Sequence, residues 1–172
     1  MNKNEIAVFW FRRDLRLHDN AGLYHALKSG LKVVPLFIFD REILDHLEDK
    51  KDRRVEFIYN AVKELHEELE QKGVGMEVHY GTPKTVFNAL LEKYNIRQIF
   101  TNHDYEPYAI HRDTLIAQLL QPHGTGFNTY KDQVIFEKGE VVKDDGKPYT
   151  VFTPLVKNGR QSLMIFTLQI IR

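Results

Sequence analysis

KVVPLFIFD, residues Lys32–Asp40, is the stretch that decides the fold. It contains seven consecutive apolar residues, so a strand formed from it would have no polar face. Strands of this kind are typical of parallel sheets that are covered by helices on both faces. We therefore expect an α/β protein, with helical segments on either side of this run.

Strand-like and helix-like segments alternate along the chain on both sides of this run. The helix-like segments carry apolar residues every three or four positions or begin with a capping residue. In chain order the segments are strand 6–11, helix 20–29, strand 32–40, helix 54–72, strand 76–80, helix 82–94, strand 97–101, helix 107–120 and strand 127–131. The alternation predicts a doubly wound, Rossmann-like sheet of five parallel strands in the order 3-2-1-4-5, with helices on both faces.

The alternation stops after residue 131. We expect an α/β domain over residues 1–132, followed over residues 133–172 by an irregular hairpin that turns at Asp145-Gly146 and by an apolar, helical tail. The tail segment LMIFTLQII is too short to span a membrane and apolar enough to pack against another surface. We expect that surface to be its own domain, a second copy or a further domain, so the isolated chain should self-associate.

Composition excludes several classes of protein. Lys and Arg together number 24, as do Asp and Glu, so no overall charge draws the chain to nucleic acid or to a membrane surface. The absence of cysteine excludes a disulfide scaffold, a thiolate zinc site and a cysteine nucleophile. The eight histidines lack metal-site spacing, and no glycine-rich phosphate loop is present. The N-terminus carries no signal segment, so we expect a soluble, cytoplasmic protein.

The two most highly charged loops follow the first and the fourth strand. In the expected strand order the carboxyl ends of these strands border the crevice in which doubly wound folds bind ligands. In the second of the two loops, residues 102–107, Asp104 and Glu106 alternate along an extended segment, so both carboxylates can point into the crevice. A solvated turn closed by Pro107 is the other interpretation of this loop.

The first loop carries three arginines, which we expect to form one wall of the crevice: Arg12, Arg13 and Arg16. Their expected partners are, in part, Asp14 and Asp104. Alternatively, Arg13 and Arg16 could form with Asp14 an ion-paired knot that only holds the loop, since arginine makes the best paired ions. Asp19 and Asn20 fit the cap of the helix that follows.

Three groups of residues together resemble the photolyase/cryptochrome family. They are FWFRRDLRL with HDN at residues 9–20, NHDYEP with Arg112-Asp113 at residues 102–113, and Tyr149 with FTP at residues 152–154. They occur in the order and at the approximate spacing found in that family, and the resemblance covers residues 5–156, the family's N-terminal α/β domain. After FTP the sequence departs from the family, because Leu155 and NGRQSLMIF stand where an aromatic residue and then a tryptophan usually follow.

The resemblance implies the antenna-chromophore domain of a light-driven flavoprotein. The implied full-length protein is a deoxyribodipyrimidine photolyase, a carbon–carbon lyase that repairs cyclobutane pyrimidine dimers in DNA by electron transfer from excited, reduced FAD. In the family a C-terminal helical domain binds FAD and the lesion, and we expect that domain to be missing here and the chain alone to be inactive. The implied partners are this FAD-binding helical domain and, through the full-length protein, damaged DNA.

The resemblance also implies an antenna site. Where the pigment is a flavin or a deazaflavin, it lies beside the D-x-E loop and an arginine of the second long helix, which match Asp104, Glu106 and Arg54. The residues expected to bind the antenna chromophore are Arg12, Phe37, Phe39, Arg54, Asp104, Glu106 and Tyr108. Carboxylates and a guanidinium can pair with the imide N–H and carbonyl groups of such a ring. Tyr108-Ala109 stand where folate-binding relatives carry Asn-Glu, so a flavin-type pigment is the first choice and methenyltetrahydrofolate the second.

Two other functions fit these residues. A cryptochrome photoreceptor uses the same architecture for signalling, and the motifs of this domain do not distinguish it from a photolyase. A free-standing nucleotide-binding α/β module would share only the fold, and the D-x-E loop together with FTP argues against it.

Overall fold

A computed structural model describes residues 4–48, 52–137 and 139–170 of the chain. The chain divides into two compact units, Met1–Gln133 and Val134–Arg172, and each is described by itself.

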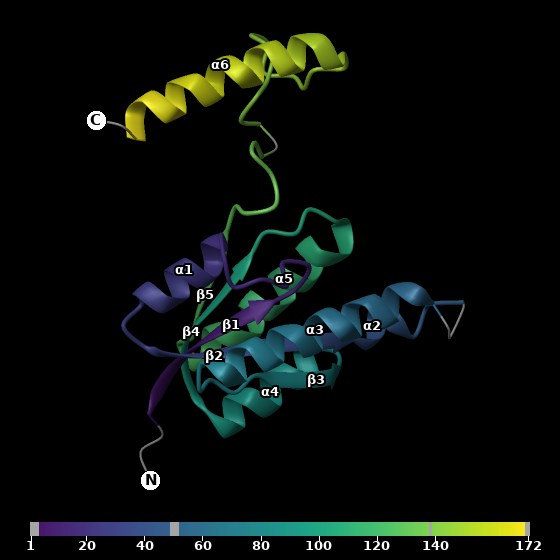
Figure 1. The fold of residues 1–172 in the computed structure, drawn as a ribbon, viewed down its shortest axis with the longest axis vertical. Helices are drawn as coiled ribbons and strands as arrows, with labels where there is room; N and C mark the ends of the chain where they lie inside the picture. Colours follow the sequence, from purple (N-terminus) through teal and green to yellow (C-terminus); the bar gives the residue numbers. More distant parts are fainter. Residues whose placement is uncertain (1–3, 49–51, 138, 171–172) are drawn as a thin grey trace. The chain divides into compact units, whose positions relative to one another are not determined.

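The first unit contains a five-stranded parallel sheet in the order β3-β2-β1-β4-β5 (Figure 1). Its strands are β1 (Glu5–Phe11), β2 (Lys32–Asp40), β3 (Glu77–Gly81), β4 (Asn95–Asn102) and β5 (Gly126–Tyr130). Its helices are α1 (Ala21–Lys28), α2 (Arg41–Leu44), α3 (Arg53–Gln71), α4 (Pro83–Lys93), α5 (Pro107–Leu120) and the 3-10 turn η1 (Gln121–His123). The predicted fold class and strand order are confirmed. The sequence predicts neither α2 nor η1, because a single helical turn is too short to show an apolar period.

Helices cover both faces of the sheet (Figure 1). On one face α1 and α3 pack over a cluster that includes Phe9 and Phe37, and on the other α4 and α5 pack over a cluster that includes Trp10 and Leu36. Side chains alternate across a strand, so neighbouring residues of β1 and of β2 enter opposite clusters. This placement explains why both strands read as continuous apolar runs.

Local signals set the ends of the helices. The side chain of Asn20 caps α1 by accepting a hydrogen bond from the amide of Leu23 at 3.1 Å, and Thr82 caps α4 in the same way. Gly73 follows α3 with a φ of 75°, a conformation that favours glycine, and so ends that helix. These boundaries lie within two residues of the predicted ones.

The second unit contains α6 (Phe152–Ile170), which agrees with the helical tail expected from the sequence. The turn at Asp145-Gly146 is present, since the amide of Gly146 donates to the carbonyl of Lys143 at 2.8 Å. The amide of Lys143 also donates to the carbonyl of Lys147 at 2.9 Å, so the chain folds back at this turn, although no regular strand flanks it among the described residues of the unit. Pro148 follows the turn and has no N–H to donate to a strand ladder. In the described part of the chain, no helix combines the length and apolar character needed to cross a bilayer.

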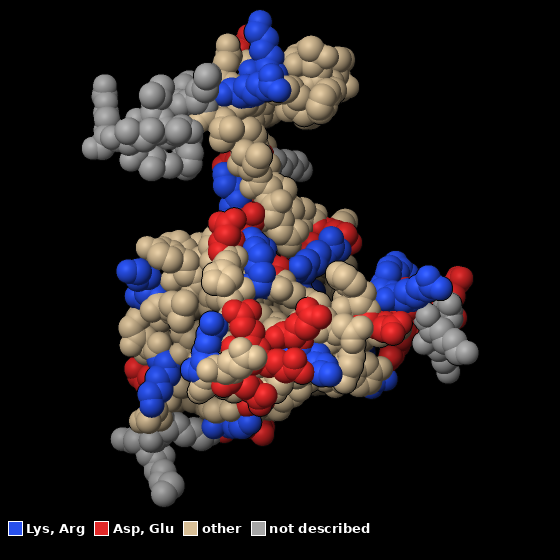
Figure 2. Space-filling view, viewed as in Figure 1, with Lys and Arg blue, Asp and Glu red and all other residues tan. Residues whose placement is uncertain are grey.

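The outward face of α3 carries charges of both signs (Figure 2). Three pairs at i,i+4 spacing lie along it with N–O distances of 3.4–3.7 Å: Lys63 with Glu67, His66 with Glu70, and Glu68 with Lys72. Exposed pairs of this kind contribute little to stability. Because both signs are present, this face does not form the basic surface that would attract a polyanion.

A pH-dependent contribution to stability is expected from Glu77 at the start of β3. Its carboxylate contacts Lys93 Nζ at 2.6 Å, His79 Nε2 at 2.9 Å and the hydroxyl of Tyr94. Burial alone would raise the pKa of Glu77, but hydrogen bonds from Lys93, Tyr94 and His79 outweigh it and lower the pKa from 4.5 to about 2. The folded pKa lies below the unfolded one, so the ionised carboxylate stabilises the fold fully above pH 4.5, and this contribution is lost as the pH falls toward 2.

Glu77→Gln should therefore lower the melting temperature at pH 7, and the difference from the parent protein should shrink progressively below pH 4.5. Melting curves by circular dichroism between pH 7 and pH 3 measure this. Glu64→Gln, on the exposed side of α3, is the matched control and should leave the curve unchanged. A difference that stays constant over the whole pH range would contradict the assignment to Glu77.

Candidate functional site

The loops that follow β1 and β4 lie next to each other at the carboxyl edge of the sheet. β1 pairs in parallel with β4, so the chain leaves both strands at the same edge. The helices that follow these strands, α1 and α5, pack on opposite faces (Figure 1). This is the switch point at which doubly wound sheets bind ligands, and we call the space between the two loops the switch-point crevice.

A buried polar network holds the first loop in place. The carboxylate of Asp14 accepts hydrogen bonds from the backbone amide of Arg12 at 2.8 Å and from the side-chain amides of Asn20 and Asn102. Asn102 also donates to Asn20 at 2.9 Å and accepts from the amide of Gly22 at 2.7 Å. This network ties the loop, the start of α1 and the end of β4 into one rigid unit.

Arg12 reaches across the crevice to α5. Its guanidinium makes a bidentate contact with Asp113 at 2.8 and 2.9 Å, and only 5% of its side chain is exposed. Its Nε is buried, and no described residue accepts a hydrogen bond from it. Burial, and then the positive charge of Arg112, lower the pKa of Arg12 from its ordinary value, while Asp113 opposes this shift. Arg12 remains a cation at neutral pH, because the ordinary pKa of arginine is so high.

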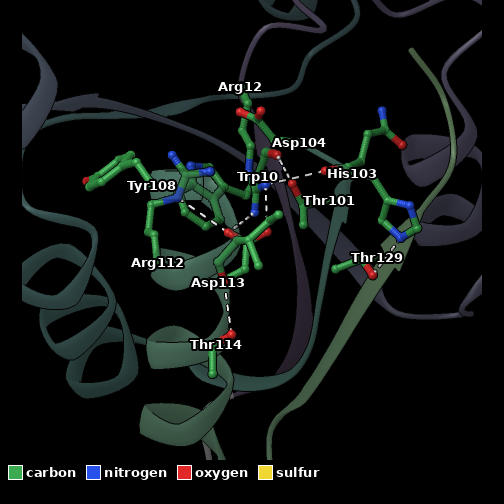
Figure 3. A network of polar contacts seen from close by, with 12 residues as sticks. Trp10, Arg12, Thr101, His103, Asp104, Tyr108, Arg112, Asp113, Thr114 and Thr129 are labelled. Carbon is green, nitrogen blue, oxygen red and sulfur yellow. Dashed lines mark hydrogen bonds and ion pairs between the residues drawn. The ribbon is translucent and has the colours of Figure 1, made fainter. Parts of the chain in front are cut away.

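A second arginine, Arg112, lies beside the same tryptophan as Arg12 (Figure 3). The guanidinium carbons of Arg12 and Arg112 lie 4.3 and 4.8 Å from the centre of the Trp10 ring, which is 2% exposed. Arg112 also lies over the ring of Tyr108, at 5.6 Å. Such contacts stabilise a cation that has little water around it, so the indole and phenol rings help to hold two buried cations at this edge.

Arg13 joins the two loops directly. Its guanidinium contacts Glu106 at 2.6 Å and Asp104 at 3.8 Å, and the hydrogen bond to Glu106 is the main reason that its pKa is raised. Both carboxylates of the D-x-E segment therefore point toward one cation, as their alternation predicts. The side chain of Asp104 is 9% exposed, whereas those of Arg13 and Glu106 are 58% and 60% exposed. Asp104 is thus the buried acid of the crevice, and Glu106 lies at its rim.

The expected partners of the first-loop arginines need correction. Asp14 forms no ion pair with Arg12, Arg13 or Arg16 among the pairs of the described residues, so the local knot does not exist and, of the two predicted partners, only Asp104 pairs with one of these arginines. Its carboxylate is occupied by amide donors instead. Arg16 pairs with Asp132, just beyond β5, at 2.8 Å and donates to the carbonyl of Asp19 at 2.6 Å. Asp19 takes a φ of 50° there, which aspartate tolerates better than most residues.

Three other predicted site residues lie on β2 and α3. Phe37 is 6% exposed and belongs to the core under α1 and α3, while Phe39 is half-buried and contacts Phe37 edge to face at 4.9 Å. Phe39 is therefore the ring with area left for a ligand. Arg54, in the first turn of α3, is 78% exposed and pairs with Asp52 at 2.5 Å. None of its observed contacts joins Arg54 to the D-x-E loop.

Tyr108, in the first turn of α5, points toward β2. Its hydroxyl donates to Asp40 at 2.6 Å, and burial followed by this hydrogen bond raises its pKa from the ordinary value. Tyr108 therefore remains a neutral hydrogen-bond donor that ties α5 to the end of β2. This contact places Tyr108 beside Arg112, on the α4 and α5 side of the sheet.

Several residues at this edge have roles that sequence reasoning does not assign. They are Asp40, Asn102, Arg112, Asp113 and Asp132. Each lies at the carboxyl end of a strand or in the first two turns of the helix that follows it, and this position is the signal that could have identified them. Within the described ranges, no three His, Cys, Asp or Glu side chains are grouped so as to hold a metal ion. The crevice instead offers cations, carboxylates and aromatic rings, which suit an aromatic ligand with imide and carbonyl groups.

Comparison with known proteins gives a consistent result. Residues 7–169 match the family described as DNA photolyase. The chain is 34% identical over 151 residues to an uncharacterized 31.6 kDa protein of Synechococcus sp. PCC 6716, covering 88% of this chain and 53% of that protein. It is 31% identical over 151 residues to a deoxyribodipyrimidine photo-lyase of Synechococcus sp. PCC 6301, covering 88% of this chain and 31% of the relative. The chain thus spans between about a third and half of the length of these relatives.

Solved structures and cryptochromes match as well. A crystal structure of an archaeal photolyase from Sulfolobus tokodaii, described as having two FAD molecules with the implication of a novel light-harvesting cofactor, superimposes with a TM-score of 0.70 at 34% identity. That match covers 78% of this chain and 32% of the archaeal one. A protein named Cryptochrome-1 from Arabidopsis thaliana is 27% identical over 147 residues, covering 85% of this chain and 21% of the relative.

Proposed function

The chain belongs to the DNA photolyase family, and from this membership we propose that it is the antenna-chromophore domain of a light-driven deoxyribodipyrimidine photolyase. The observation that carries the proposal is the position of Asp104. Its carboxylate is largely buried at the switch point of a photolyase-type sheet and pairs with Arg13. The relatives named deoxyribodipyrimidine photo-lyase support repair of pyrimidine dimers in DNA as the activity of the full-length protein. Damaged DNA and a helical FAD-binding domain are accordingly its proposed partners.

The proposed pigment is a flavin or a deazaflavin, and the residues of the crevice fit such a group. Asp104 and Glu106 can accept hydrogen bonds from an imide N–H, and the unpartnered Nε of Arg12 is a donor without an acceptor. Phe39 supplies an apolar surface, and Arg54, being exposed, is free to change its partner. When bound, an antenna pigment absorbs light and passes the excitation to a second flavin by dipole coupling. The task of the chain is then to hold the pigment at a constant distance and orientation, which suits loops fastened by buried hydrogen bonds.

A cryptochrome photoreceptor is the second candidate, because proteins of that name also match this chain. The residues that would separate repair from signalling surround FAD and DNA in the family, and the crevice does not include them. Repair of a dimer-containing oligonucleotide under near-UV light by the full-length protein tests the choice. Membership of the family excludes the third alternative, a module that shares only the fold.

Asp104→Ala should weaken pigment binding 30- to 150-fold, which corresponds to about 2–3 kcal/mol for a charged hydrogen-bonding partner lost from a largely buried site. Fluorescence titration of the chain with riboflavin, FMN and a deazaflavin measures this. Glu64→Ala on α3 is the control and should bind like the parent protein. Unchanged affinity of Asp104→Ala would contradict the assigned contact, and a preference for methenyltetrahydrofolate would contradict the choice of pigment.

A further inference from the structure

A concave site lies between the start of α4 and the first three turns of α5, and Tyr108 and Arg112 are among the residues that line it. It is a hollow of about 410 Å³. Its lining includes the apolar side chains of Pro83, Leu115 and Leu119 and the basic side chains of Lys84, His111 and Arg112. α4 and α5 cover the face of the sheet opposite to α1 and α3 (Figure 1), so this α4–α5 pocket is on the far side of the sheet from Phe39 and Arg54.

The polar end of the pocket contains a buried cation whose hydrogen bonds are incomplete. Only 9% of the Arg112 side chain is exposed, yet its nearest acceptors are Asp113 at 3.3 Å from Nε and Asp40 at 4.0 Å from Nη1. Its Nη2 is buried and has no hydrogen-bond partner among the residues that the structure describes. A guanidinium carries five N–H donors, and a buried charge without enough acceptors is costly. An additional acceptor beside Arg112 would lower that cost.

The start of α4 adds a second source of positive potential. Thr82 is the N-cap and accepts a hydrogen bond from the amide of Thr85, and Pro83 occupies the first helical position. The first amides of a helix have no acceptor within the helix and, with the helix dipole, favour an anion. α4 is 11 residues long, and Thr82, Pro83 and Lys84 all line the pocket. The basic side chain of Lys84 therefore lies at the same end as these amides.

Of the carboxylates near the pocket, the two beside Arg112 already have partners within the protein. Glu42 also lines the pocket, but it is exposed and lies at the rim. Asp40 accepts the hydroxyl hydrogen bond of Tyr108 at 2.6 Å and lies 4.0 Å from Arg112 Nη1, and Asp113, the other carboxylate beside Arg112, also makes the bidentate contact with Arg12. From these contacts we infer that the α4–α5 pocket binds a small organic anion, one phosphate or carboxylate group joined to an apolar body. The anionic group lies toward Arg112, Lys84 and the start of α4, and the body lies on Leu115 and Leu119.

The test is an NMR titration of the 15N-labelled chain with phenyl phosphate, benzoate, inorganic phosphate and phenol. Phenyl phosphate or benzoate should shift the amides of Lys84, Thr85 and residues 111–115 in a saturable way. Whichever of the two binds more tightly identifies the anionic group. Phenol and inorganic phosphate should each bind at least about tenfold more weakly, because each lacks one half of the recognised chemistry.

Variants separate this site from the crevice. Arg112→Gln tests the buried cation, and its amide spectrum shows whether it folds. Lys84→Ala combined with His111→Ala changes only exposed side chains and should weaken phenyl phosphate or benzoate binding at least about tenfold. Lys63→Ala on α3 is the control. The double variant should bind riboflavin like the parent protein, because the pigment is assigned to the crevice, so either proposal can fail without the other.

Three outcomes would overturn the inference. They are the absence of saturable shifts with either organic anion, equal affinity for phenol, and equal affinity for inorganic phosphate. Equal binding of phenol would identify an apolar pocket only, and equal binding of inorganic phosphate would reduce the site to general attraction by surface cations. Undiminished binding of the organic anion by a folded Lys84→Ala, His111→Ala variant would also contradict it.

Discussion

Replacing Asp113 with alanine is expected to lower the free energy of unfolding by about 3–5 kcal/mol, the usual cost of leaving a buried charge without its partner. Asp113 is shared by two guanidiniums, since it makes the bidentate contact with Arg12 and accepts from Arg112 Nε at 3.3 Å. Both arginines are at least nine-tenths buried and already have an N–H without an acceptor. Alanine would leave two cations on the Trp10 ring with no carboxylate between them. Urea denaturation at neutral pH measures the loss.

Two further variants make the result specific. Asp113→Asn keeps the size and one acceptor but loses the charge, so its loss should be smaller than that of alanine. Glu67→Ala breaks an exposed pair with Lys63 at 3.7 Å and should leave the denaturation midpoint almost unchanged. If Asp113→Ala were as stable as Glu67→Ala, the Arg12–Asp113 pair would not be a buried interaction in solution.

Gly22→Val should be the next most damaging change, with an expected loss of about 3–4 kcal/mol from overpacking and a broken hydrogen bond. A Cβ at Gly22 would lie 2.7 Å from Asn102 Oδ1 and 2.9 Å from the Phe9 ring. Neither group can move away, because Phe9 is fully buried and Asn102 is held by its bonds to Asp14 and Asn20. The better helix propensity of a larger residue contributes well under about 1 kcal/mol, so the clash decides that Gly22→Val lowers the free energy of unfolding.

Gly75→Val is the matched control for Gly22→Val. A Cβ at Gly75 would have no atom within 4 Å, and its backbone is outside the left-handed region, so the variant should unfold at nearly the parent's urea concentration. Because Gly22 lies under the first loop, Gly22→Val should also weaken pigment binding when measured on the fraction that stays folded. A stable Gly22→Val variant would show that α1 can move away from β4, which would contradict the rigid loop on which the antenna proposal depends.

The fold could be predicted from the sequence because its determinants are local. Seven apolar residues in a row identify β2, the recurrence of Val62, Leu65 and Leu69 identifies α3, and Thr82-Pro83 identifies the start of α4. Each of these signals involves residues that lie a few positions apart and acts through backbone preferences or the burial of one face. Strand order then follows from the rules that govern parallel sheets. The turn at Asp145-Gly146 could be predicted for the same reason, because its signal is also local, whereas the pairing of strands on either side of a turn is not.

The sequence by itself thus determined the parallel sheet, its order and the two charged loops that meet at its edge. Only the tertiary structure decided which charges pair: Arg12 with Asp113, Arg13 with Glu106 and Arg16 with Asp132. These partners are 101, 93 and 116 residues apart. Coulomb attraction has no preference for one carboxylate over another beyond distance and burial. Both quantities are defined only once the strands have placed the loops. The arginines therefore pair with carboxylates of α5, of its N-cap and of the segment just after β5, and not with the nearby Asp14.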